Sequence, residues 1–148
     1  MKKILKLLPL LLIAVLGISL SSCSDKDEPV SPKELPSIAK DFIIEYFPSA
    51  SIVSSQKDKD DYDVVLSDGT KIEFNKKGEW IDVEAAPAKT LPTGFYPANI
   101  DSYLAENFEG IGISEITKVN RGYEVEIFTG TELLFAPDGS FIMVGVDR

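Results

Sequence analysis

The sequence repeats itself at an offset of 61 residues, and this repeat constrains the fold more than any other feature. Without a gap, residues 36–83 superimpose on residues 97–144 with 13 identities in 48 pairs. Most matched positions are apolar or belong to turns, such as Tyr62 with Tyr123, Gly69 with Gly130 and Trp80 with Phe141. The repeat therefore predicts two similar folded units. It contains no recurring polar set that could act on a substrate.

Each unit has the pattern of one helix followed by four strands. In the first, an amphipathic segment begins at Leu35-Pro36 and stops at Pro48. Four runs with strand character follow, divided by turn signals such as Asp68-Gly69. We therefore predict an α+β fold built by tandem duplication, in which each N-terminal helical segment packs on a four-stranded antiparallel meander. The expected units are 35–84 and 91–148, joined by a linker at 85–90, and their open sheet edges are natural places to join.

Residues 1–22 have the pattern of an export signal. Lys2, Lys3 and Lys6 precede an apolar run of about 14 residues, which is too short for the roughly 20 residues of a membrane-spanning helix. The run ends in Leu20-Ser21-Ser22-Cys23, which resembles the lipobox of bacterial lipoproteins. We expect Cys23 to be acylated and to anchor the chain, since a single cysteine cannot form an internal disulfide.

The segment after the anchor predicts a flexible tether and a location. Residues 23–34 are charged, contain proline and have few apolar groups, so folding is expected to begin near Leu35. By resemblance to known lipoproteins, Ser24 argues against retention in the inner membrane, so we expect the outer membrane. The run Asp25-Lys26-Asp27-Glu28 resembles a surface-export tether, and a solvated spacer is the alternative.

Charge excludes several classes of partner. Without residues 1–22, the remaining 126 residues contain 12 basic side chains (15 minus 3) and 24 acidic ones, a net charge near −12. Such a surface repels nucleic acid and anionic lipid, so membrane contact should come through the lipid anchor alone.

Most enzyme chemistry is also excluded by residue type. The sequence has no histidine, and its one cysteine is assigned to lipid, which rules out serine or cysteine triads and zinc sites made of thiolates or imidazoles. The acidic run Asp58, Asp60, Asp61 and Asp63 lacks the glycine and terminal glutamate of a calcium-binding loop, and a turn accounts for it better. No glycine-rich phosphate loop is present. We expect no metal, no cofactor and no enzymatic activity.

The sheet face opposite the helices is where a partner could bind. Period-two alternation predicts that this face is polar in the first unit and apolar in the second. The predicted contact residues are Trp80, Phe128, Leu134, Phe141 and Met143. The alternative is that these side chains pack under the linker, between the units or against Val146 to Arg148.

The first unit resembles a known family. The segments that carry this likeness are Tyr46-Phe47-Pro48, Tyr62-Asp63-Val64, Leu66 to Thr70, Ile72-Glu73-Phe74 and Lys77 to Trp80. They are similar to the PepSY-like, beta-lactamase-inhibitor-like lipoproteins of Bacteroides-type bacteria, whereas Phe128-Thr129-Gly130 departs from the pattern. The resemblance implies a fold like that of the beta-lactamase inhibitor protein, whose open sheet face grips an enzyme.

Three functions follow as hypotheses of decreasing weight. The first is a lipid-anchored binding module for an envelope or secreted protein, including the possibility of an inhibitor. The second is a sensor of a small ligand or of envelope stress, which a concave pocket between the units would support. The third is a hydrolase, which would require two carboxylates converging in a cleft.

Overall fold

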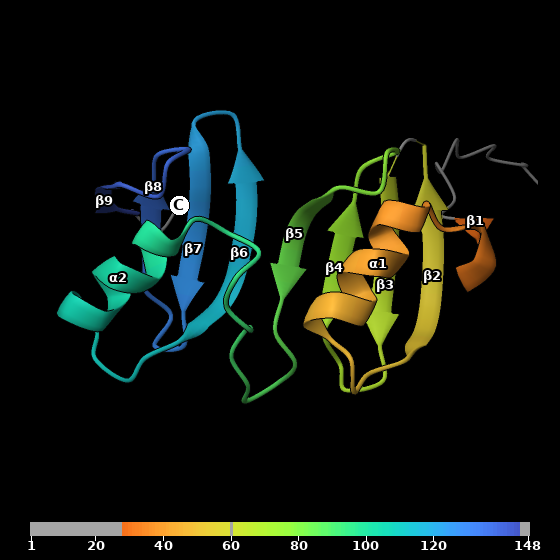
Figure 1. Cartoon of the computed structure of the whole chain (residues 1–148), viewed down its shortest axis with the longest axis horizontal. Helices are drawn as coiled ribbons and strands as arrows, with labels where there is room; N and C mark the ends of the chain where they lie inside the picture. The colour runs from red at the N-terminus through yellow and green to blue at the C-terminus, as the bar shows by residue number, and fades with distance from the viewer. Residues whose placement is uncertain (1–27, 60, 146–148) are drawn as a thin grey trace, which may run out of the picture.

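The computed structural model describes residues 28–59 and 61–145. It is an α+β fold with one antiparallel sheet of nine strands in sequence order and two α-helices on the same face of that sheet (Figure 1). A short 3-10 helix, η1 (Pro32–Glu34), precedes the first α-helix. The elements are β1 (Glu28–Pro29), α1 (Ser37–Tyr46), β2 (Ile52–Asp58), β3 (Asp61–Leu66), β4 (Lys71–Phe74), β5 (Trp80–Glu84), α2 (Ala98–Asn107), β6 (Ile113–Val119), β7 (Gly122–Ile127), β8 (Glu132–Phe135) and β9 (Phe141–Val144).

We call residues 28–84 the first half and residues 97–145 the second half. The elements of the second half begin 61 residues after their counterparts, as α2 at 98 does relative to α1 at 37, and β9 at 141 relative to β5 at 80. The halves meet where β5 pairs antiparallel with β6, through Asp82 with Thr117 and Val83 with Ile116. The two expected meanders are thus parts of one continuous sheet.

The core lies between the sheet and the helices. Ala39, Phe42 and Ile43 recur on one side of α1 and are buried, and Ile100 and Leu104 do the same on α2. They pack on alternate strand residues, namely Val64, Leu66, Ile72, Phe74, Val83, Ile116, Val125, Ile127, Leu133 and Phe135. In the part of the chain that the structure describes, no helix is both long and apolar enough to span a membrane.

Folded structure begins earlier than the sequence predicts. Glu28 and Pro29 pair with β2, and the side chain of Ser31 caps η1 while Glu34 bonds back to the Ser31 N–H at 2.7 Å. Val30 is partly buried against the core. Residues 28–34 are therefore part of the folded structure, and the expected start near Leu35 is wrong. The proline and the charges that suggested a tether here instead form a short edge strand and a capped turn. Residues 1–27, which include the signal segment and Cys23, lie outside the described residues.

Candidate functional site

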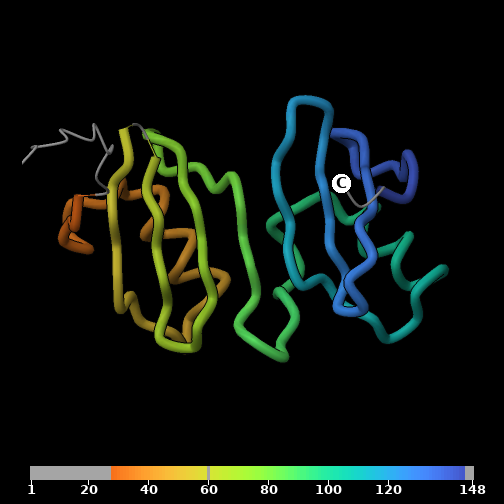
Figure 2. The backbone as a smooth tube through the Cα atoms, turned by 180° about the vertical axis from the view of Figure 1, so that it is seen from behind, coloured from red at the N-terminus to blue at the C-terminus, as the bar shows by residue number. Residues whose placement is uncertain are grey.

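The face of the sheet opposite the helices is the candidate site. Both helices lie on one side of the sheet, and the view from behind has the strands nearest the viewer with the helices beyond them (Figure 2). Among the described residues, no helix covers this second side, which we call the open face. Side chains that point to it alternate with the core residues along each strand.

Trp80 does not lie on the open face, contrary to the prediction. Its side chain is 7% exposed and packs on the helix side, with its ring stacked 6.1 Å from Tyr123 and edge-on at 5.2 Å to Phe95. The ammonium of Lys118 lies 3.9 Å from the ring centroid. The cause is a β-bulge, because Glu73 pairs with Asp82 but Phe74 pairs with Trp80, which leaves one extra residue between them. Trp80 therefore joins the two halves from inside, as the alternative of packing between the units anticipated.

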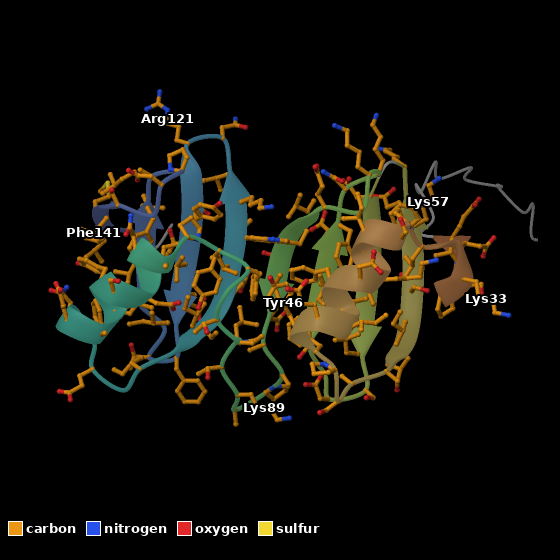
Figure 3. All side chains as sticks on the ribbon, viewed as in Figure 1. Lys33, Tyr46, Lys57, Lys89, Arg121 and Phe141 are labelled. Atoms are coloured by element: carbon orange, nitrogen blue, oxygen red, sulfur yellow. The ribbon has the colours of Figure 1, made fainter. Side chains whose placement is uncertain are left out.

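Phe141 is displaced by the same irregularity in the second half. Leu134 pairs with Met143 but Phe135 pairs with Phe141, so Ile142 is the extra residue. The Phe141 ring stacks on Tyr103 of α2 with centroids 4.2 Å apart, and Figure 3 shows it beside this helix. Phe141 belongs to the helix side, and its predicted place on the open face is wrong.

The other three predicted contact residues are not brought together in one cluster. Leu134 and Met143 are cross-strand partners on the open face, and Met143 is 45% exposed. Phe128 follows the end of β7, is 53% exposed, and lines a cleft of about 460 Å³ with linker residue Thr90. Of the five predicted contact residues, only Leu134 and Met143 are neighbours on the open face.

Carboxylates, not aromatic side chains, dominate the open face. Strand register places them in two rows that run across both halves. One row contains Asp63, Glu73, Asp82 and Glu124, and the other contains Glu84, Glu115, Glu126 and Glu132. We call these eight residues the acidic band. Residues directly opposite on neighbouring strands have Cβ atoms about 4.5–5.5 Å apart, so like charges in a row repel.

The acidic band holds its carboxylates in an unfavourable electrostatic environment. Partial burial raises the pKa of Glu73, and the charge of Asp63 adds to the effect. Partial burial also raises the pKa of Asp82, with a further contribution from Glu84, although a threonine hydroxyl bonds to Asp82. Burial and the charge of Asp82 raise the pKa of Glu115. Each shift means that the ionised form costs free energy in the fold.

Lys71 occupies a position in the second row, beside Glu84. The ammonium of Lys71 bonds to Glu84 at 2.9 Å, and this exposed pair neutralises one of the eight carboxylates. Lys118, the lysine of the neighbouring strand β6, is turned to the helix side over Trp80 and cannot offset the acidic band directly. The open face is therefore strongly negative at neutral pH.

The arrangement does not provide a metal centre or a cleft with converging catalytic groups. In the described ranges, no set of three or more histidine, cysteine, aspartate or glutamate side chains is placed to hold a metal ion. In the acidic turn, Asp58 pairs with Asp61 across the loop, and Asp60 lies outside the description. The clefts beside the linker are open to solvent, and the cleft of about 460 Å³ that Phe128 lines contains Lys89 as its one charged lining residue. Carboxylates on a flat sheet face can attract cations or basic surfaces.

Sequence reasoning recognised some of the band but not its continuity. Glu124 and Glu126 alternate with apolar residues in the sequence, so the period-two pattern alone can place them on the side opposite Val125 and Ile127. Glu84 and Glu115 were not recognised as members because their proximity depends on the pairing of β5 with β6. Extending the period-two pattern from Asp82 to Glu84 would have placed Glu84 on the open face, whereas a β-bulge between Ile113 and Glu115 interrupts the alternation in β6.

Comparison with known proteins identifies relatives. The family model described as "Putative beta-lactamase-inhibitor-like, PepSY-like" matches residues 60–143. A solved structure described as a calcium-regulated periplasmic protein of Bacteroides thetaiotaomicron is 27% identical with a TM-score of 0.75, and the match covers 81% of this chain and 97% of that one. A periplasmic protein of Bacteroides vulgatus is 30% identical with a TM-score of 0.76, covering 82% of this chain and 100% of the other. No curated protein matches.

Proposed function

Because this chain belongs to the beta-lactamase-inhibitor-like, PepSY-like family, we propose that it is an exported binding module whose open sheet face contacts a positively charged surface of an envelope or secreted protein. The observation that carries this proposal is the acidic band, which crosses both halves of the sheet and is not covered by a helix among the described residues.

Electrostatics supports a basic partner over a neutral one. Burial, reinforced by neighbouring carboxylates, raises the pKa of Glu73, Asp82 and Glu115, so the ionised form of each group is unfavourable in the free protein. Lysine or arginine side chains of a partner would relieve this repulsion and donate charge-assisted hydrogen bonds to the same oxygens. Complementary charge also speeds encounter between two proteins, which suits a partner present at low concentration.

The family description suggests a more specific role, inhibition of an enzyme. An inhibitor that uses the open face would need a target enzyme with basic residues around its active site. The apolar pair Leu134 and Met143 would add an anchor at one end of the contact. A ligand sensor is not favoured, since the clefts beside the linker are open, and the cleft that Phe128 lines has one charged lining group, Lys89.

Location completes the proposal. Relatives described as periplasmic support export. We propose acylation at Cys23 and attachment to the outer membrane, with surface exposure as a further step. Four residues lie between Cys23 and Glu28, the first residue of β1, and a chain of this length spans at most about 18 Å, so the sheet would lie within that distance of the anchor. A Cys23→Ala chain should lose fatty-acid labelling and leave the membrane fraction, which tests the anchor. We also propose that the two halves arose by tandem duplication.

Zero-length crosslinking in the producing cell's envelope tests the partner proposal. A carbodiimide reagent joins carboxylates directly to amines, so it reports contacts between the acidic band and a partner's lysines. The test variant carries Asp82→Asn, Glu84→Gln, Glu115→Gln and Glu126→Gln, which keep the side-chain shapes. The control carries four neutralised acids from exposed helical or helix-end positions, namely Asp41→Asn, Glu45→Gln, Glu106→Gln and Glu109→Gln.

Both variants change the net charge by four, so only the position of the change differs. We expect one protein to crosslink to the wild type and to the control, and to be lost with the open-face variant. Raising the salt to 1 M should weaken the same crosslink, because the Debye length falls to about 3 Å. Equal loss of the crosslinked product with both variants would mean that net charge alone controls binding, and it would contradict a specific open-face contact.

A further inference from the structure

The two outer edges of the nine-stranded sheet are treated differently. At one edge, β1 covers part of β2, and the hydroxyl of Ser55 donates to the carbonyl oxygen of Val30 at 2.7 Å. Pro29 lies in that edge strand. At the other edge, β9 pairs with β8 on one side only, and no described segment pairs with its outer side. Figure 1 shows β1 and β9 at opposite ends of the molecule.

The internal repeat shows what an edge of the β9 type can accept. β9 begins 61 residues after β5, and β5 uses its outer edge to pair with β6. Val83 of β5 lies opposite Ile116 of β6 and is 0% exposed. Val144 occupies the corresponding place in β9 and is 51% exposed. Val83 and Val144 have the same side chain and the same place in their strands. Their exposed fractions differ because no described strand pairs with the outer edge of β9.

The composition of β9 does not protect it. Edge strands of soluble proteins commonly carry lysine, proline or other charged residues that block pairing with another chain. None of the four residues of β9 is charged, and Ile142, Met143 and Val144 are each about half exposed. In β5, the equivalent of Met143 is Asp82. The uncovered edge is thus more apolar than the edge that is already paired inside the chain.

Backbone groups at this edge point outward for pairing. The N–H of Gly145 donates to the carbonyl oxygen of Glu132 on β8 at 2.7 Å. Because hydrogen-bonding direction alternates along a strand, the N–H and C=O of Val144 point away from β8. A strand placed beside β9 would therefore find a donor and an acceptor in register.

We propose that β9 is a docking edge that accepts one extended antiparallel strand from another protein. The strand would place an aliphatic side chain against Val144, as Ile116 covers Val83, and an uncharged side chain opposite Met143. A second copy of this chain offers no suitable β6-type edge, because the equivalent strand β2 has Ser55 in place of Ile116 and is already covered by β1. The edge adjoins the end of the acidic band at Glu132 on β8, but pairing would use the outward backbone groups of β9 and none of the carboxylates.

A peptide taken from this chain can probe the edge. The sequence of β6 with one flanking residue at each end, Gly112 to Asn120, already pairs with a β5-type edge, so a fluorescent copy should bind β9 of the full exported chain. Fluorescence anisotropy gives its affinity. Hydrogen exchange with mass spectrometry should show slower exchange in residues 141–145 when the peptide is bound.

Variants separate edge pairing from other binding. Val144→Pro removes the outward N–H and leaves the β8 ladder, since proline is tolerated where the N–H faces solvent. We expect at least a tenfold loss of peptide affinity. Val144→Lys is a second variant that keeps the backbone donor and should also lower peptide affinity at least tenfold. The matching change in the peptide, Lys in place of Ile116, should lower its affinity for the wild-type chain by at least the same factor.

Three results would overturn the proposal. One is equal peptide affinity for wild type and for both Val144 variants. Another is protection by the peptide at β5 rather than β9, which would indicate exchange with the native β6. The third is a homodimer that forms without peptide and protects residues 141–145, which would assign the edge to a second copy.

Discussion

Removal of the Trp80 side chain should destabilise the whole fold. Trp80 is 7% exposed and contacts aromatic rings from both halves, with Phe42 at 6.4 Å and Tyr123 at 6.1 Å between ring centroids. Truncation of a buried tryptophan to alanine costs about 3–5 kcal/mol. The pairwise aromatic contacts and the Lys118 cation–π contact, each worth about 0.5–2 kcal/mol, favour the upper part of that range. Domains of this size unfold with about 5–15 kcal/mol, so Trp80→Ala should leave a marginally stable protein.

Urea denaturation followed by circular dichroism measures this loss. Trp80 is the only tryptophan of the chain, so acrylamide quenching of its fluorescence independently reports its burial before any substitution. Met143→Ala is the control, since Met143 is 45% exposed on the open face and should cost less than about 1 kcal/mol. A loss below about 1 kcal/mol for Trp80→Ala, together with strong quenching in the wild type, would refute the inward placement of this residue.

Three further predictions concern local features. Glu115→Gln should raise the free energy of unfolding at pH 7 by less than about 1 kcal/mol, because partial burial and neighbouring carboxylates raise the pKa of Glu115. The folded state then binds the Glu115 proton more tightly than the unfolded state does, so native stability falls as pH rises through this pKa. In urea titrations, the advantage of glutamine should vanish near pH 3.5. Gly122→Ala should destabilise by several kcal/mol or prevent folding, since φ is +138° and a Cβ would collide with the β8 backbone, whereas Gly130→Ala, with φ +82° and open space, should cost about 1 kcal/mol in the same assay. Ser55→Ala should remove the 2.7 Å bond to Val30, lower stability by about 1 kcal/mol and speed proteolysis before α1; unchanged cleavage would contradict an anchored β1.

Elements that depend on local pattern were predictable from the sequence. The helix that stops before Pro48 and the strand pair around Asp68-Gly69 are where the pattern places them, as α1 and the β3–β4 hairpin. Apolar spacing determines which side of a helix is buried, and glycine determines where a hairpin turns. These signals lie within a few residues of one another, so they survive without knowledge of the tertiary structure. The structure confirms the α+β class.

The site was harder to predict because it depends on single-residue irregularities and on long-range pairing. Ile81 and Ile142 are extra residues in their strands, and each reverses the side on which the preceding aromatic residue lies. Strict period-two alternation cannot detect a bulge, so it placed Trp80 and Phe141 on the wrong face. The join between β5 and β6, which completes the acidic band, involves strands separated by α2 and the linker.

The most direct test of the proposed function places a photo-crosslinking amino acid on each side of the sheet. Glu124 is exposed on the open face, and Glu106 is exposed on α2, so replacing each in turn loses one carboxylate and differs only in location. In the producing cell, we expect position 124 to crosslink to one envelope or secreted protein and position 106 to give no such product. The same product from both positions, or a product from position 106 alone, would contradict the open face as the contact surface.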